Sequence, residues 1–364
     1  MRATAHGPAG RTVPLPHRAT GWRPTGWAAG LAWACTAGLA WAQAPAPTPP
    51  LAAATATVAQ PDATRLDHGL RPRAIAPNTW VIEGAVADFG RANGCNIINT
   101  GFIATPAGVI VVNTGPGRLY GEQQRQAIAR VTPLPVVRVL NLNLHPDYFF
   151  GNQAYGDVPT EALPGSIRGM RAEGQAYEDN LFRLCGDWMK GTESTPARQA
   201  LQPGVFEWGG HRLELLRLSG HTDDDLVLID HSTGVVFAGG LVFADRVPTT
   251  PHARLVDWQA SLERLRQRAS ALPLRVMVPS HGPVHTDLRG LEQTRDWLQW
   301  LAHTLSDSAR AGLDLGEVLA LPIPPRFAGW AALPAEYVRS VTHLYPQHEL
   351  AALRGQPAPG VTGR

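Results

Sequence analysis

The stretch Asn141-Leu142-Asn143-Leu144-His145-Pro146-Asp147-Tyr148-Phe149-Phe150-Gly151-Asn152 decides how this chain is interpreted. It follows the apolar run 135–140, which predicts a buried strand, and it leads into a predicted helix. His145 and Asp147 therefore stand two residues apart at the end of a strand, where an imidazole and a carboxylate can bind one metal ion. This pattern predicts a metal centre at the edge of a sheet.

Three further segments follow apolar runs in the same way. They are 218–222 with His221, 237–243 with Gly240, and 278–283 with His281. Because each of these segments lies just past a predicted strand, we expect all of them to gather beside His145 and Asp147. Rigid strands would then hold the ligands and leave an open position for water or substrate.

Together, these segments resemble the metal-binding motifs of the metallo-β-lactamase superfamily. The stretch 143–148 is similar to its His-x-His-x-Asp-His signature, 218–222 to its Gly-His-Thr segment, and 278–283 to its final Pro-Gly-His-Gly segment. The resemblance implies the α/β class, as a four-layer αββα sandwich with two sheets face to face and helices outside. It also implies a metal-dependent hydrolase.

More narrowly, the chain resembles the quinoprotein relay system zinc metallohydrolases (type 1) over about residues 78–350. The stretches that carry this resemblance are 99–103, 113–116, 145–147 with 151–154, and 245–249. The resemblance implies an exported protein that is associated with a periplasmic quinoprotein system for alcohol oxidation.

The chain departs from the superfamily's ligand pattern at four positions. An intact site holds two zinc ions. Asn143 stands in place of a histidine of the first zinc site, and Tyr148 in place of a histidine of the second. Gly240 removes the aspartate that bridges the two ions. Asn113 replaces an aspartate that usually orients a ligating histidine.

The remaining ligands predict a reduced site. With Asp147 as the single carboxylate, two zinc ions would repel each other strongly in a cleft of low dielectric constant. We therefore expect one zinc ion, held by His145, Asp147, His221 and His281. Asp147 would act as a ligand or as the catalytic general base. The alternative is a cleft without metal, in which these four side chains hydrogen-bond to one another.

Four more residues are candidates for lining the site: Asn143, Tyr148, Gly240 and Asp245. Tyr148 would ligate metal, donate a proton or simply pack, and packing is favoured because a phenol ligates well only after a large pKa shift. Asn143 either orients water or substrate or serves as a structural amide. Asp245 would pair with Arg246, near the cleft or on the surface.

Other polar residues near these motifs are interpreted as surface features. The acidic run 223–225 is typical of a solvated turn, with a helix cap or a contact to the site as the alternatives. The histidines predicted to lie in exposed loops are His211, His231, His252 and His285.

The chain has a predicted order of segments. Residues 1–42 resemble a secretory signal peptide, with an apolar stretch at 27–41 that is short for a membrane span, and Cys35 offers a weaker alternative as a lipid anchor. Residues 43–71 are predicted to be a flexible linker, 72–352 the metallo-β-lactamase-like domain with its C-terminal helices, and 353–364 a disordered tail. We expect export to the periplasm and no stable membrane insertion.

Charge and cysteine content narrow the function further. Of the 32 basic residues, Arg2, Arg11, Arg18 and Arg23 lie in the predicted signal peptide, so the rest of the chain has 28 basic against 30 acidic residues. The sequence has no stripe of basic residues of the kind that would indicate nucleic-acid binding. After cleavage, Cys95 and Cys185 remain, either as a disulfide or as two separate buried thiols.

Apolar patterning predicts the elements that carry the motifs. The predicted strands are 79–82, 96–104, 108–113, 136–143, 205–208, 212–218, 226–230, 235–238 and 275–279, and the predicted helices are 120–131, 166–189, 255–270 and 287–311.

The sequence therefore predicts an exported metallohydrolase that acts on a small organic substrate with one zinc ion. The alternative function is a non-catalytic accessory or binding protein with a degenerate metal site, working with a periplasmic quinoprotein system.

Overall fold

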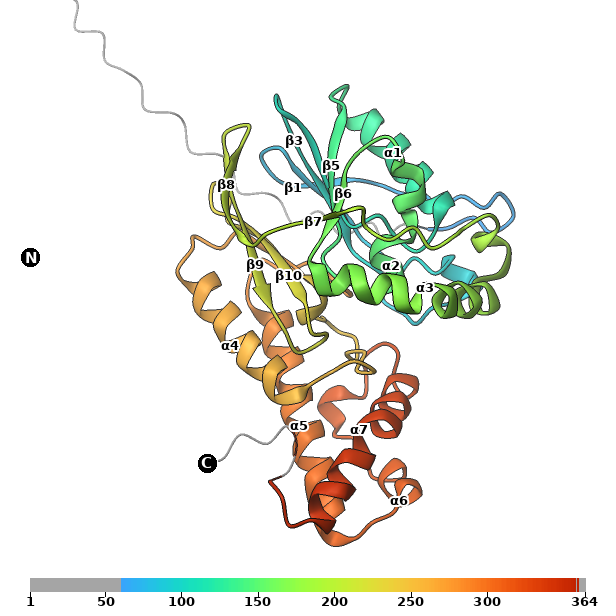
Figure 1. Ribbon diagram of the computed structural model, residues 1–364, viewed down its shortest axis with the longest axis vertical. Coiled ribbons are helices and arrows are strands. Elements are labelled where there is room, and N and C mark those ends of the chain that lie inside the picture. Colours follow the sequence, from blue (N-terminus) through green and yellow to red (C-terminus); the bar gives the residue numbers. More distant parts are fainter. Residues whose placement is uncertain (1–59, 358, 360–364) are drawn as a thin grey trace, which may run out of the picture. The chain divides into compact units, whose positions relative to one another are not determined.

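The computed structural model describes residues 60–357 and residue 359 of the chain. The predicted signal peptide, the predicted linker as far as residue 59, and the tail at residues 358 and 360–364 lie outside the described residues. The described part consists of two sheets and the helices that cover them (Figure 1).

The first sheet has seven strands in the order in which they occur along the chain. They are β1 (Arg73–Ala76), β2 (Thr79–Ile82), β3 (Thr100–Thr105), β4 (Gly108–Val112), β5 (Val136–Leu140), β6 (Thr160–Ala162) and β7 (Gln199–Ala200). Strands β1 to β4 pair antiparallel, and β4 to β7 pair parallel. Parallel pairing requires crossovers, and these crossovers carry helices to the outer face.

The second sheet has five strands in the order β12-β11-β10-β9-β8. They are β8 (Gly204–Trp208), β9 (His211–Leu218), β10 (Asp225–Asp230), β11 (Val235–Phe237) and β12 (Val276–Val278). Only the β11–β12 pair is parallel.

Alternating side chains give each sheet two apolar faces. On β4, Ile110 and Val112 belong to the core between the sheets, whereas Val111 packs with α1 (Arg118–Val131) on the outer side. On β10, Leu228 faces the same central core while the residues on either side of it face α4 (Leu255–Ser270) and α5 (Arg289–Ala311). This arrangement of layers confirms the predicted αββα sandwich.

The remaining helices extend this frame. They are α2 (Pro146–Phe149), α3 (Pro164–Cys185), α6 (Leu315–Leu319) and α7 (Ala335–Leu353), with short 3-10 turns between several elements. Figure 1 shows α1 and α3 beside the first sheet, and α4 and α5 beside the second. None of the helices in the described part of the chain combines the length and hydrophobicity that a membrane crossing needs.

Most predicted elements are present, and the differences have local causes. Prediction missed β1, β6 and β7, which are at most four residues long, and β7 is exposed at both positions. The strand of the motif ends at Leu140 rather than at 143. Beyond that point, the amide of Leu142 donates to the side chain of Asn113 instead of a strand partner.

The folded part begins earlier than the predicted start at residue 72. The backbone amide of His68 donates to Gln123 Oε1 at 2.8 Å, and Gln123 Nε2 donates to the carbonyl of Leu66 at 2.8 Å. The His68 ring is buried against Trp188 and Tyr120. Residues 60–71 therefore belong to the folded body and not to the linker.

Cys95 and Cys185 form a disulfide, with their Cα atoms 5.9 Å apart. This resolves the two alternatives that the sequence leaves open in favour of pairing. The bond connects the loop before β3 to the last residue of α3.

We expect acid to destabilise the fold partly through His68, because burial lowers the pKa of this imidazole from 6.5 to about 4. The unfolded chain takes up a proton near pH 6.5 and the folded chain does not, so stability falls between pH 6.5 and about 4. The contribution is at most about 3 kcal/mol. Urea unfolding at several pH values should show a shallower acid dependence for His68→Phe, and an unchanged dependence would contradict this prediction.

Candidate metal centre

The four predicted ligands lie together at one edge of the two sheets. His145 precedes α2 and Asp147 lies within it, His221 lies between β9 and β10, and His281 follows β12. All four line one cavity of about 270 Å³. The structure thus brings together side chains that are up to 136 positions apart in the sequence.

His281 forms hydrogen bonds with Asp147 and Ser280. His281 Nε2 lies 2.9 Å from Asp147 Oδ2, and His281 Nδ1 lies 2.9 Å from Ser280 Oγ. The imidazole also stacks on Phe243, with ring centroids 4.9 Å apart and an angle of 3° between the planes. Burial lowers the pKa of His281, which favours its neutral form.

His145 is within hydrogen-bond distance of His252, which was predicted to lie in an exposed loop. His145 Nε2 lies 2.9 Å from His252 Nδ1, and His252 Nε2 lies 3.0 Å from Glu173 Oε2. Tyr177 Oη donates to the same carboxylate oxygen at 2.5 Å. Both His252 and Glu173 are only about one third exposed. The prediction for His252 was therefore wrong, because its loop turns back over the cavity.

The sequence gives little signal for this contact. His252 lies only three residues beyond the segment 245–249, and Glu173 and Tyr177 are four apart on α3, which places them on one face of the helix. These spacings do not reveal that the loop and the helix meet at His145.

His221 is held by the carboxylate of Asp225, which is fully buried. Asp225 Oδ2 accepts the backbone amides of His221 and Thr222 at 3.1 and 3.0 Å, and Asp225 Oδ1 lies 3.4 Å from His221 Nδ1. The other ring nitrogen, His221 Nε2, is buried and has no hydrogen-bond partner among the described residues. A buried polar atom without a protein partner is costly, so this nitrogen is available to bind an ion or a water molecule.

Asn143 has a structural role, which is one of its two predicted roles. Its Nδ2 donates to Asp225 Oδ1 at 2.7 Å and to Thr222 Oγ1 at 3.1 Å, and its Oδ1 accepts the amide of His145 at 3.2 Å. Both ends of the amide are therefore engaged. Asn143 joins the loop after β5 to the start of β10.

Gly240 leaves room for the imidazole of His221. A Cβ atom at position 240 would lie 2.1 Å from His221 Nδ1. Any side chain there, including the bridging carboxylate of the superfamily, would collide with this ring. A carboxylate at position 240 and the observed position of the His221 ring therefore exclude each other.

Tyr148 and Asp245 do not line the cavity. Tyr148 is buried in the core between the sheets, and burial, reinforced by Asp147, raises the pKa of its phenol well above 10. Asp245 accepts a hydrogen bond from Gln293 at 2.7 Å and does not pair with Arg246. Arg246 is buried instead against Glu336.

Several polar residues are more buried than predicted. In the acidic run 223–225, Asp224 and Asp225 are buried, and Asp224 accepts the amide of Gly165 at 2.6 Å. His211 is also buried, with its Nδ1 2.7 Å from Asp230 Oδ2. Only Asp223 is solvated, with its side chain 85% exposed, whereas Asp224 accepts a hydrogen bond from the first turn of α3 and Asp225 contacts the site, as in the alternative predictions. The prediction of an exposed His211 was wrong, because this ring pairs with Asp230 inside the fold.

The four predicted ligands lie together, but they are not arranged around an ion in the described part of the chain. Burial and the neighbouring histidines 221, 252 and 281 lower the pKa of His145 well below 6.5, so it is neutral, which is the form that ligates metal. Within residues 60–357, however, no three His, Cys, Asp or Glu side chains are already placed to hold an ion. The ring nitrogens of His145 and His281 are bonded to other side chains instead.

The remaining wall of the cavity is mostly apolar, and its charged side chains are Arg183 and two arginines, Arg246 and Arg339, that pair with Glu336. Its apolar side chains include Phe89, Ile97, Leu184 and Phe243. Arg183 also lines it and donates to Asn180 Oδ1 at 2.7 Å. At about 270 Å³, the cavity is slightly smaller than the range of about 300–1,000 Å³ that is usual for drug-sized ligands.

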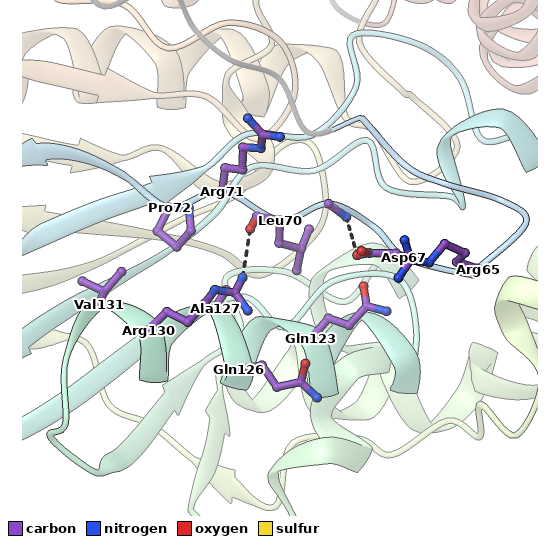
Figure 2. Close-up of a pocket in the computed structure, with 11 residues that line it drawn as sticks. Arg65, Asp67, Leu70, Arg71, Pro72, Gln123, Gln126, Ala127, Arg130 and Val131 are labelled. Atoms are coloured by element: carbon purple, nitrogen blue, oxygen red, sulfur yellow. Dashed lines mark hydrogen bonds between the residues drawn. The ribbon is translucent and has the colours of Figure 1, made fainter.

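A larger cavity of about 730 Å³ lies elsewhere, between α1 and the segment 65–72 (Figure 2). Its wall includes Arg65, Arg71 and Arg130, and Arg130 donates to the carbonyl of Leu70. No histidine, cysteine or hydroxyl side chain lines it. We therefore place the chemistry at the histidine cavity.

We expect Gly240→Ala to destabilise the protein by about 1–3 kcal/mol, because the new methyl group must displace the ring of His221. Gly156→Ala is the matched control, since nothing lies within 4 Å of a Cβ atom at that position. Guanidinium unfolding of both variants measures the difference. Equal stability of the two variants would show that His221 moves freely.

Comparisons with known proteins agree with this geometry. The sequence matches the metallo-beta-lactamase superfamily over residues 93–281, about half of the chain. A linear primary-alkylsulfatase from Pseudomonas sp. is 24% identical over 286 residues, which are 66% of this chain and 53% of that protein. The chain thus spans about half of the length of that curated relative.

Solved structures show the same fold. A metallo-beta-lactamase from Pontibacter korlensis is similar with a TM-score of 0.52 and 24% identity, covering 63% of this chain and 99% of that one. Metallo-beta-lactamase IND-7 is similar with a TM-score of 0.51 and 18% identity, covering 63% and 97%. With two face-to-face sheets, histidines at the strand ends and a superfamily match over half of its length, the chain belongs to the metallo-β-lactamase superfamily.

Proposed function

We propose that this protein is a hydrolase that acts on a small organic substrate with the help of one metal ion, most suitably zinc. The observation that carries the proposal is the buried, unpartnered Nε2 of His221 beside the neutral imidazole of His145, with ring centroids 4.7 Å apart. Imidazoles at one cavity wall are ligands that zinc prefers.

A single ion is proposed because the second zinc position has lost its ligands. Tyr148 is buried away from the cavity, and Gly240 offers no carboxylate. His281 and Asp147 are bonded to each other. A second divalent ion beside the first would be neutralised poorly by the one carboxylate of Asp147.

The ion and the side chains around it would have different roles in the reaction. A bound divalent ion supplies Lewis-acid polarisation and lowers the pKa of water toward 7. Asp147 lines the cavity and accepts a proton as general base, while His281 orients its carboxylate through the 2.9 Å hydrogen bond. Phe243, stacked on His281, fixes that pair and keeps the wall apolar.

The cavity suggests the kind of substrate. Its volume of about 270 Å³ corresponds to roughly nine water molecules at about 30 Å³ each, so the bound portion is small. Apolar walls with an arginine at the rim favour a molecule with an apolar body and an anionic group. The similarity to a protein named linear primary-alkylsulfatase supports including short alkyl sulfates among the test substrates.

The compartment is part of the proposal. The disulfide between Cys95 and Cys185 is typical of oxidising compartments, and the N-terminal sequence resembles a signal peptide. These features support export to the periplasm. The link to quinoprotein alcohol oxidation is proposed from the sequence resemblance alone.

A second candidate function is a metal-independent accessory or binding protein of such a system. One observation favours it: in the described part of the chain, the candidate ligands do not form a group ready to hold an ion. In that case the cavity would bind a small ligand through its apolar wall.

We expect near-stoichiometric zinc in protein purified without added metal. His145→Ala and His221→Ala should each remove most of it, because each deletes a ligand at the centre of the site. His343→Ala, on the exposed side of α7, is the control and should keep its metal. Inductively coupled plasma mass spectrometry measures the content. Absence of zinc, with a melting temperature that added zinc does not raise, would favour the accessory function instead.

If hydrolysis of anionic esters is found, we expect Arg183→Gln to raise KM by up to about fivefold with little change in kcat. This guanidinium is exposed, and exposed charge pairs contribute about 0.2–1 kcal/mol. Steady-state kinetics with an anionic and a neutral ester separates the effect, since KM for the neutral ester should not change. An equal rise for both esters would show that Arg183 does not recognise charge.

A further inference from the structure

We propose that His252 is the third imidazole ligand of the metal ion and that Glu173 fixes it in the ligating tautomer. This inference rests on the proposed function, because it concerns the same ion. His252 lies outside the four sequence segments that resemble the superfamily's motifs. It would supply the nitrogen that Asn143 cannot.

Asn143 is not free to act as a ligand. Its Oδ1 accepts the amide of His145, and its Nδ2 donates to Asp225 and Thr222. Using the oxygen on a metal would leave a buried amide without its partner. Asn143, which stands where the superfamily has a histidine ligand, therefore has a structural role.

Glu173 determines which nitrogen of His252 carries the proton. A carboxylate only accepts hydrogen bonds, so the tautomer of His252 that matches the 3.0 Å contact carries its proton on Nε2. Its Nδ1 then presents a lone pair toward His145. Hydrogen bonding of the remote ring nitrogen to a carboxylate is the usual arrangement of a metal-ligating histidine, because it fixes the tautomer and strengthens the ligand.

The spacing between the two rings is close to that of two ligands on one ion. His145 Nε2 and His252 Nδ1 are 2.9 Å apart, as in a hydrogen bond. Two nitrogens bound tetrahedrally to zinc at about 2.0–2.1 Å lie about 3.3–3.4 Å apart. Ligation thus requires a separation of a few tenths of an ångström, with the His145 proton moving to Nδ1.

The ring of His221 also lies beside His145 and has a carboxylate near one of its nitrogens. Its Nδ1 lies near the carboxylate of Asp225, and its buried Nε2 has no described partner. The ring centroid of His145 lies 4.7 Å from that of His221 and 5.1 Å from that of His252. Two imidazoles, each with a carboxylate nearby, therefore lie beside a third, and three imidazoles are a donor set that zinc accepts.

His281 is a poorer choice for the third ligand. Its Nε2 is bonded to Asp147, its Nδ1 lies against Ser280, and its ring is stacked on Phe243. Recruiting it would break a buried imidazole–carboxylate bond. His252 gives up only its contact with His145.

Zinc titration of the full-length protein tests the inference. We expect His252→Phe to weaken zinc binding at least 100-fold and Glu173→Gln about 10-fold, with fold integrity checked by circular dichroism. The matched control is His231→Phe, which removes a His–Glu pair of similar length, 2.8 Å to Glu214, away from the cavity. This variant should bind zinc as the wild type does.

A second measurement identifies the ligating atoms. With ¹¹³Cd²⁺ and ¹⁵N-labelled histidine, NMR coupling should reach Nδ1 of one imidazole, lost in His252→Phe, and Nε2 of two others. Wild-type zinc affinity in His252→Phe, together with its loss in His281→Phe, would overturn the inference while leaving the proposed function intact. A wild-type protein that binds no zinc at all would refute the proposed function itself.

Discussion

The carboxylate of Asp225 is the constraint on which the site depends. It lies at the first residue of β10, in the second sheet, and accepts hydrogen bonds from His221, Thr222 and Asn143. Asn143 follows β5 of the first sheet, so this one buried group ties the edges of both sheets together. The cost of burying a carboxylate is offset by four donated hydrogen bonds, including that from the Thr222 hydroxyl.

The charge of the site follows from this arrangement. The cavity combines several imidazoles with the carboxylate of Asp147, and the carboxylates of Asp225 and Glu173 lie beside the imidazoles of His221 and His252. Gly240 is required by this geometry, since a side chain at position 240 would collide with the ring of His221. Gly240 and the position of His221 are thus linked by one steric constraint.

The sequence predicted the sheets, the main helices and the meeting of His145, Asp147, His221 and His281, because these depend on local apolar patterns and on motifs at strand ends. It could not predict the contact between His145 and His252. That contact depends on the path of an irregular loop and on where α3 passes, and neither leaves a periodic pattern. The burial of Asp225 was missed for a related reason: composition indicates solvent exposure on average, but the partners of one carboxylate are set by tertiary structure.

The disulfide has a practical consequence for anyone who prepares this protein. Cys185 ends α3, the helix that carries Glu173, and its bond to Cys95 anchors that end of the helix to the loop before β3. Protein made in a reducing cytoplasm would lack this anchor, and the geometry behind His252 would become looser. Oxidised and reduced preparations of identical sequence would then differ in the geometry of this side of the cavity. The Cys95–Cys185 disulfide should therefore be verified in any preparation of this protein before biochemical measurements are made.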